Sequence, residues 1–428
     1  MDSNDNKYAS IVKHVCSSLF IAFSFLYLYF IQGEYIAKLQ FILSDGRTIY
    51  SIFWGALIIT LLLKIIQLLT QRIFITSLHF YALTYIPSFM FLVVLCDIFV
   101  STTQHINLGW WWLGIPLTLF FTYLLNKWSY DIRKHLFSHN TQHKLLSFLL
   151  SNFLVFFILF LLSGSINSTS DTELYEMKVE RLIKMGKYNE ALHVGKKSLS
   201  SNRRLTNLRM YALSRLRQLP DKLYDYPQYY GKEGLLCLYD IDQSNYRVDV
   251  RDICSYLGIY NLKNITSTEQ LFNEAINRQQ IIFDSLMSIE LYKSNNPDSL
   301  KIEVEKRYKY IKEMKRRIDE YTLCSLLLER DLELFKNKIN NVYNFNIRDD
   351  SIVKTETLPK SYREALVMIY PDLEDTLMLK QYNEYLELKA SEKDSVAWSN
   401  KTRRKYGNTF WWYYDNPQIT IKRFIKNL

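Results

Sequence analysis

Three histidines have a spacing that suits metal binding. His135, His139 and His143 recur every four residues, so on a helix their imidazoles would share one face, as metal ligands often do. They stand in a polar loop where a helix is not expected, and no carboxylate or cysteine lies between them. We interpret the spacing as coincidental and predict no metal site.

Asp97 is the one acidic residue inside an apolar run. An ionisable group within a membrane span is by default a candidate functional residue. Asp97 lies near the end of its run, however, where water or His105 can satisfy it. The nearby Trp110–Trp112 fit an interfacial belt, in which an indole places its apolar body and its N–H at the headgroup level. The alternative is a lipid or glycan site that uses Asp97, His105 and these tryptophans.

Other catalytic signatures are missing from the sequence. It contains no GxSxG elbow, HExxH helix or glycine-rich phosphate loop, and His193 is the single histidine after residue 163. Cys237, Cys254 and Cys324 have no zinc spacing, although a Cys237–Cys254 disulfide stays open. The sequence therefore predicts no catalytic residue, cofactor or metal. An enzyme is not excluded, but a binding role is favoured.

Five apolar runs separated by short polar joints fill residues 1–163. The last run is uncharged and lacks proline and glycine. A bilayer core takes roughly 20 helical residues, and a segment in lipid must satisfy its own backbone. We therefore predict a bundle of about five transmembrane helices, at Cys16–Ile31, Tyr50–Leu69, Ser77–Val100, Leu108–Leu125 and Leu145–Leu162. The stretch Tyr35–Leu43 is amphipathic and too short to span, so it is expected along the interface.

The basic residues of the short loops predict an orientation. With the N-terminus inside, the outer loops contain Lys38 and Arg47. The inner segments then contain Lys7, Lys13, Arg72, Lys127, Arg133, Lys134 and Lys144. This bias follows the positive-inside rule. With five crossings, residues 164–428 lie outside the cytoplasm, which in an inner membrane means the periplasm.

Residues 164–428 predict a soluble helical-repeat domain. Gly186 falls between two apolar-periodic stretches that run to Leu199, with small Ala191 at the expected helix contact. Pro220 stands 34 residues after Gly186, which matches the tetratricopeptide period. Further helices are predicted at Thr266–Tyr292, Asp298–Tyr321, Thr322–Tyr343 with a turn near Arg330-Asp331, and Lys360–Tyr370 and Leu373–Leu388 on either side of Pro371. In such repeats a concave surface binds partners, and its plausible lining residues are Tyr175, Arg209 and Tyr211.

Charge and aromatic content limit the classes of partner that this domain is expected to bind. The chain has 53 Lys and Arg against 43 Asp and Glu, but both signs are interspersed, whereas nucleic-acid binding needs a clustered basic stripe. We therefore predict no nucleic-acid partner. The basic cluster Lys312, Lys315, Arg316 and Arg317 fits a solvated face, with docking to an acidic partner or to phospholipid headgroups as the alternative. The aromatic run Phe410–Tyr414 is interpreted as a cap on the helix stack rather than a membrane contact.

Three motifs and the apolar N-terminal third together resemble a known family. The motifs are LPDKLYDYPQ at Leu219–Gln228, LPKSYREAL at Leu358–Leu366 and NTFWWYY at Asn408–Tyr414. The chain resembles uncharacterised inner-membrane proteins of Bacteroides-type bacteria with a tetratricopeptide-like C-terminal domain. The resemblance implies an inner-membrane location with the repeat domain in the periplasm, and it transfers no catalytic residue.

These observations favour an all-α, integral membrane protein with a bundle at 1–163 and a helical-repeat domain at 164–428. Its expected partners are the lipid bilayer and a protein or peptide bound by the periplasmic domain, as in a scaffold. The alternative is a membrane-embedded enzyme of envelope lipid or glycan metabolism, with its site at the outer mouth of the bundle. A transporter is disfavoured because few buried polar groups are expected in the bundle.

Overall fold

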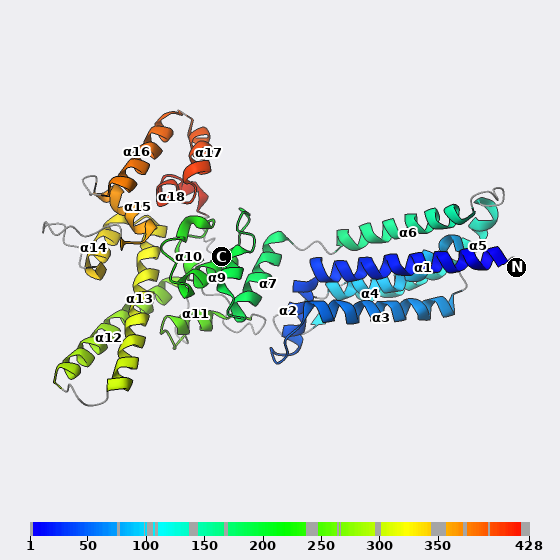
Figure 1. The fold of residues 1–428 in the computed structure, drawn as a ribbon, viewed down its shortest axis with the longest axis horizontal. Coiled ribbons are helices and arrows are strands. Elements are labelled where there is room, and N and C mark those ends of the chain that lie inside the picture. Colours follow the sequence, from blue (N-terminus) through cyan, green and yellow to red (C-terminus); the bar gives the residue numbers. More distant parts are fainter. Residues whose placement is uncertain are drawn as a thin grey trace. The chain divides into compact units, whose positions relative to one another are not determined.

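A computed structural model describes residues 3–74, 78–97, 99–100, 106–107, 110–136, 144–166, 170–236, 247–262, 265, 267–295, 301–343, 357–370, 375–392 and 394–420 (Figure 1). The chain divides into two compact units. The N-terminal unit comprises Met1–Ser170 with Gln243–Tyr246, and the C-terminal unit comprises Asp171–Asp242 and Arg247–Leu428. Each unit has its own hydrophobic core.

The N-terminal unit consists of long apolar helices. They are α1 (Ser3–Leu26, continued by one π-helical turn at Tyr27–Ile31), α2 (Gly33–Leu43), α3 (Ile52–Ile73), a 3-10 segment (Leu78–Tyr85) leading into α4 (Ile86–Asp97), α5 (Trp111–Leu136) and α6 (Lys144–Ile166). A two-residue antiparallel pair joins β1 (Phe99–Val100) to β2 (Ile106–Asn107). Otherwise the regular structure of the described residues is helical, so the predicted all-α class is confirmed.

Four segments are long and apolar enough to cross a membrane: Lys7–Ile31, Ile52–Ile73, Leu78–Asp97 and Leu145–Ser165. They correspond to four of the five predicted spans. The remaining span falls on α5, where the apolar part, Trp111–Leu125, is shorter. The predicted amphipathic stretch Tyr35–Leu43 lies within helix α2.

The C-terminal unit is built from helices of unequal length. They are α7 (Asp171–Lys184), α8 (Tyr188–His193), α9 (Arg203–Arg215), a 3-10 turn (Leu223–Asp225), α10 (Lys232–Leu235), α11 (Val250–Tyr256), α12 (Thr268–Asn295), α13 (Lys301–Glu329), α14 (Leu332–Tyr343), α15 (Lys360–Ile369), α16 (Thr376–Ala390), α17 (Ser395–Tyr406), α18 (Phe410–Asp415) and a last 3-10 turn (Pro417–Ile419). The helices predicted after residue 266 are therefore present, but the predicted boundary between Tyr321 and Thr322 was wrong, because α13 continues without a break to Glu329.

The hairpin predicted around Gly186 forms only in part. Gly186 turns the chain with a φ of +74°, and Ala191 is fully buried at the helix contact. Helix α8 nevertheless ends at His193, and Leu199 is exposed outside any helix. Gly195 explains the early end, because its φ is +57° and a Cβ there would meet the ring of Tyr175 at 2.7 Å. The extension of this helix to Leu199 was wrong.

The turn predicted near Arg330 ties two distant parts of the C-terminal unit together. Arg330 adopts a φ of +63°, a conformation that costs free energy for a non-glycine residue. Its guanidinium donates from Nε and Nη2 to the carbonyl oxygen of Tyr413, at 3.2 and 3.0 Å, and stacks over the Tyr413 ring. These contacts offset the strain and anchor α18 to the end of α13.

The aromatic run at the C-terminus is buried inside its own unit. Phe410, Trp411, Trp412 and Tyr413 lie in the core, with Trp411 almost fully enclosed. Its Nε1 donates to the carbonyl oxygen of Glu364 at 2.8 Å. This burial is what the capping interpretation expects.

Glu364 gives this core a pH dependence. Its carboxylate accepts from the Phe410 N–H at 2.7 Å and faces Lys360 at 3.6 Å, but burial dominates and raises the pKa of Glu364 from 4.5 to about 7. The folded protein therefore holds a proton that the unfolded chain releases, and the free energy of unfolding falls as pH rises from about 4.5 to 7.

Replacing Glu364 by glutamine should abolish this fall in the free energy of unfolding. Glutamine never ionises, and its side-chain oxygen can still accept from the Phe410 N–H. We expect E364Q to gain on the order of 3 kcal/mol relative to wild type across that pH window. Urea unfolding of the full-length protein in detergent at several pH values measures it. The exposed Glu387→Gln on α16 should show no such trend. A stability difference for E364Q that is independent of pH would contradict the assignment.

Candidate functional site: a cationic cleft in the C-terminal unit

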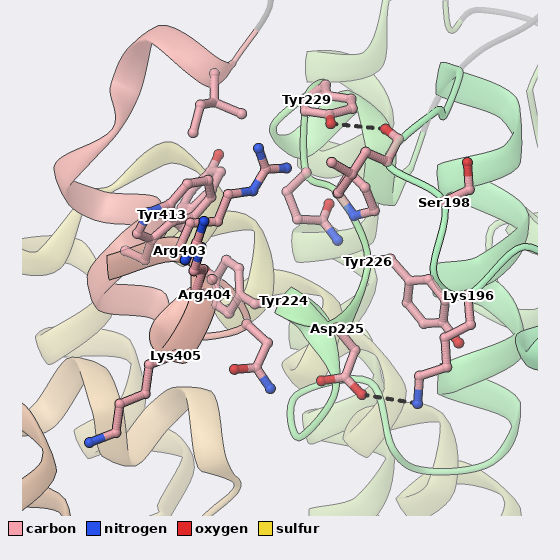
Figure 2. Close-up of a pocket in the computed structure, with 17 residues that line it drawn as sticks. Lys196, Ser198, Tyr224, Asp225, Tyr226, Tyr229, Arg403, Arg404, Lys405 and Tyr413 are labelled. Carbon is pink, nitrogen blue, oxygen red and sulfur yellow. Dashed lines mark hydrogen bonds and ion pairs between the residues drawn. The ribbon is translucent and has the colours of Figure 1, made fainter. Parts of the chain in front are cut away.

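A cleft of about 440 Å³ opens between two walls of the C-terminal unit (Figure 2). We call it the cationic cleft. Its lining residues are Lys196, Ser198, Leu199, Tyr224, Asp225, Tyr226, Pro227, Gln228, Tyr229, Arg403, Arg404, Lys405, Gly407, Asn408, Trp412, Tyr413 and Ile419. Its volume suits a few side chains of a bound peptide.

The first wall combines the irregular chain just after α8 with the first 3-10 turn of the unit and the chain that follows that turn. Tyrosine hydroxyls fix this wall to the backbone: Tyr226 donates to the carbonyl of Leu192 at 2.6 Å, and Tyr229 donates to that of Leu199 at 2.9 Å. Lys196 and Asp225 form a long ion pair of 3.8 Å across the same wall. This wall therefore offers aromatic surface with its charges nearly balanced.

The second wall is the C-terminal end of α17 together with α18, and it is basic. Figure 2 shows Arg403 and Arg404 on this ribbon, opposite the wall that carries Tyr226. Arg403 lies over the Trp412 ring, 5.3 Å from its centroid. Lys405 is directed away and pairs with Glu384 at 2.8 Å. Among the described residues, neither arginine forms an ion pair with a carboxylate, so two positive charges face the cleft uncompensated.

Aromatic packing holds the two walls together. The Tyr224 ring of the first wall lies 5.9 Å from that of Phe410 and 5.2 Å from that of Tyr413. Burial holds the pKa of Tyr224 well above its usual value, so its hydroxyl stays neutral. The cleft is thus shaped by a rigid, uncharged base.

Arg209 adds a buried charge behind the first wall. Its side chain is 0% exposed, donates to the carbonyls of Val194 and Gly195 at 3.0 and 3.3 Å, and stacks on Tyr226. Burial lowers the pKa of Arg209, but an arginine stays protonated in proteins. The prediction that Arg209 and Tyr211 line a concave surface was wrong, because both are buried in the core. Arg209 is therefore not accessible from the cleft, and it contacts the lining residue Tyr226 from behind.

The composition of the cleft favours binding over catalysis. Its lining contains Asp225 as its one carboxylate, and no histidine or cysteine. General acid–base catalysis needs a titratable group poised near the reacting atoms, and Asp225, the one carboxylate of the lining, is already paired with Lys196 at 3.8 Å. Guanidinium groups beside tyrosine and tryptophan rings instead suit carboxylates and the side chains that flank them.

Three of the four residues in the basic cluster of α13 pair with carboxylates of their own helix. Arg316 pairs with Glu313 at 2.6 Å and also with Glu320, and Lys315 pairs with Asp319 at 2.8 Å. The interpretation as a solvated face is therefore favoured over docking to an acidic partner or to headgroups.

The structure brings together only some residues of the alternative site, which was predicted at the mouth of the bundle from Asp97, His105 and Trp110–Trp112. Trp111 Nε1 donates to Asp97 at 2.7 Å, while Trp110 and Trp112 are 87% and 74% exposed. His105 lies outside the described residues. The Asp97 carboxylate thus accepts a hydrogen bond from a half-buried indole.

The remaining candidate ligands do not form a metal site among the described residues, where no cluster of histidine, cysteine and acidic side chains occurs. His135 lies near the end of α5, and His139 and His143 fall outside the described residues. Cys254 is a buried free thiol, and its possible partner Cys237 is outside the described residues too.

The bundle holds a polar network that the sequence analysis missed. Gln67 is fully buried in α3 and donates to Tyr81 and Thr84, and Asn152 of α6 bonds the backbone at Leu78 and Ala82. The expectation of few buried polar groups was therefore wrong. The available signal was Lys64 and Gln67, one turn apart within an apolar run.

A comparison with known protein families finds one family whose profile covers nearly all of the cleft residues. The profile of a family of unknown function (DUF6057) matches residues 98–296 and 315–416, well over half of the chain. No curated protein and no solved structure matches. Apart from Ile419, every residue that lines the cleft lies within the matched ranges.

Proposed function

The chain belongs to this family of unknown function, and from its structure we propose a membrane-anchored binding protein. Its C-terminal helical unit binds an acidic segment of a protein or peptide at the cationic cleft. The observation that carries this proposal is the pair Arg403 and Arg404, which faces a cleft of about 440 Å³ without carboxylate partners among the described residues.

An acidic peptide fits this cleft for physical reasons. Carboxylate–guanidinium hydrogen bonds are short and are among the stronger polar contacts in proteins. Tyr229 lines the cleft with a partly exposed ring, and tyrosine often contributes strongly to binding energy at interfaces. The buried charge of Arg209 raises the potential of the wall behind Tyr226 without being accessible itself.

The surface of the N-terminal unit supports the membrane part of the proposal. Large apolar side chains along the outer faces of α3 and α6 are exposed, including Trp54, Ile58, Leu61, Leu150 and Phe157. A soluble protein rarely exposes apolar surface on this scale. Lipid is the solvent that makes such faces favourable.

The proposed topology has the N-terminus in the cytoplasm and the C-terminal unit in the periplasm, with the protein in the inner membrane. It needs five crossings, so α5 must cross as well as the four longer segments. A protease added to the periplasmic face of spheroplasts should then digest the C-terminal unit. Protection of that unit in intact spheroplasts would contradict the topology.

The binding role predicts selectivity for negative charge. A labelled glutamate-rich peptide should bind the full-length protein in detergent, and a peptide with glutamine at the same positions should bind at least about tenfold more weakly. Raising the salt concentration should weaken the first interaction because exposed charge pairs are screened. Fluorescence anisotropy measures both. Equal affinity for the two peptides would reject the proposed function.

A further inference from the structure

The N-terminal unit carries a charge deep inside an apolar helix. Lys64 is the single charged residue of α3 between Ile52 and Gln71. It precedes the end of the helix by nine residues, or roughly 13 Å at the α-helical rise. A charge at such a position is expensive in hydrocarbon and is normally paired or functional.

Polar groups bond the Lys64 ammonium without neutralising it. Its Nζ donates to Gln67 Oε1 at 2.6 Å and to the Tyr85 hydroxyl at 3.3 Å. Gln67 and Tyr85 are both fully buried. Among the described residues Lys64 forms no ion pair with a carboxylate. One N–H of the ammonium therefore remains for an anion.

Lys13 brings a second cation to the same place. Its Nζ lies 6.0 Å from the centroid of the Tyr81 ring, and that ring is 6.0 Å from the ring of Tyr85, over which Lys64 lies. Lys13 likewise has no carboxylate partner among the described residues. Two ammonium groups thus flank one tyrosine pair, and mutual repulsion makes an anion between them favourable.

Both lysines belong to the same end of the bundle. The start of α1 and the end of α3 lie together there (Figure 1). Gln67 is one turn closer to that end than Lys64, so the ammonium is directed toward it. Lysine stems extend along apolar surface in this way and place the charge near the headgroup layer.

We propose that Lys13 and Lys64, positioned by the buried Tyr81 and Tyr85, bind the phosphate of an anionic phospholipid in the leaflet at this end of the bundle. Basic pockets between transmembrane helices recognise lipid headgroups by this chemistry. The proposal requires that the N-terminal unit spans the membrane, but it is independent of the cationic cleft.

Native mass spectrometry of the full-length protein tests the proposal. After delipidation and incubation with phosphatidylglycerol or phosphatidylcholine, the wild type should retain phosphatidylglycerol preferentially. Lys13→Gln and Lys64→Gln should each lower that retention about fivefold. Lys64→Arg should preserve it, and Lys38→Gln on α2 serves as the charge-matched control. Lys13 is exposed, so its substitution leaves the core intact even if Lys64→Gln disturbs folding.

Unchanged phosphatidylglycerol retention in Lys13→Gln, or equal retention of the two lipids by the wild type, would overturn the proposal. An equal loss in Lys38→Gln would show a general charge effect and would overturn it as well. Displacement of the bound lipid by excess inorganic phosphate would assign the site to a soluble anion instead, whereas resistance to phosphate supports the lipid.

Discussion

Replacing both Arg403 and Arg404 by glutamine should weaken binding of the glutamate-rich peptide by about a hundredfold. A hydrogen bond to a charged group contributes about 1.5–3 kcal/mol, which corresponds to at least about tenfold in affinity for each arginine. Neither guanidinium pairs with a carboxylate of the described chain, so their substitution breaks no internal ion pair. Peptide anisotropy on the full-length protein measures the loss, and each single variant should show part of it.

A charge-matched variant tests whether peptide affinity depends on the cleft arginines or only on the net charge of the protein. Lys306 and Lys309 are exposed on α13 and do not line the cleft. Their double replacement by glutamine changes the net charge by the same amount, and it should alter peptide affinity less than about twofold. If the two double variants lose affinity equally, the peptide responds to net charge and the cleft is not its site.

Truncating Trp411 to alanine should destabilise the C-terminal unit by about 3–5 kcal/mol, the range for large aromatic residues in a core. Trp411 is 1% exposed, and its ring packs on Tyr382, Tyr385 and Tyr406. The change also leaves the Glu364 carbonyl without its donor. We expect the melting temperature to fall by roughly 10 °C, measured by circular dichroism of the full-length protein.

Two further variants qualify this result. Trp411→Phe keeps most of the ring contacts but loses the N–H, so it should cost less than half of the alanine effect. Trp398→Ala removes a half-buried indole of α17 and should also cost less than Trp411→Ala. An effect of Trp411→Ala no larger than that of Trp398→Ala would contradict the place of Trp411 at the centre of this core.

Sequence patterns predicted the elements that are long and periodic. Helices α12 and α13 cover the predicted segments because apolar residues recur there at helical spacing, and Met314 and Ile318 of α13 are buried. The turn at Arg330 was also located from the sequence. Length and periodicity are local properties, and a single stretch of chain contains them.

Local sequence patterns could not predict the cleft. Its walls, near Tyr226 and near Arg404, are about 180 residues apart in sequence, and each alone resembles an ordinary polar segment. Arg209 was misassigned for a related reason, because helical periodicity does not reveal that an arginine can be buried by carbonyls and a tyrosine ring. Gly195 likewise ended α8 through a left-handed conformation that the repeat pattern did not show.

The bundle shows the same division between local and long-range information. Hydropathy identified the four long apolar segments, since every residue of a span contributes to that signal. The partners of Gln67 come from the segment around Tyr81, which only packing brings together. Buried polar contacts between helices therefore could not be predicted from the sequence of either helix alone.

Site-specific photo-crosslinking in intact cells tests the central claim most directly. A photoreactive residue at Leu199, which lines the cleft and is 56% exposed, is compared with one at Leu334 on α14, which is 55% exposed and does not line it. We expect the Leu199 probe to crosslink to an acidic segment of a partner. This crosslink should disappear in the Arg403→Gln/Arg404→Gln double variant, and the Leu334 probe should give no crosslink. Crosslinking of the same segment from Leu334, or crosslinking from Leu199 that persists without the two arginines, would contradict it.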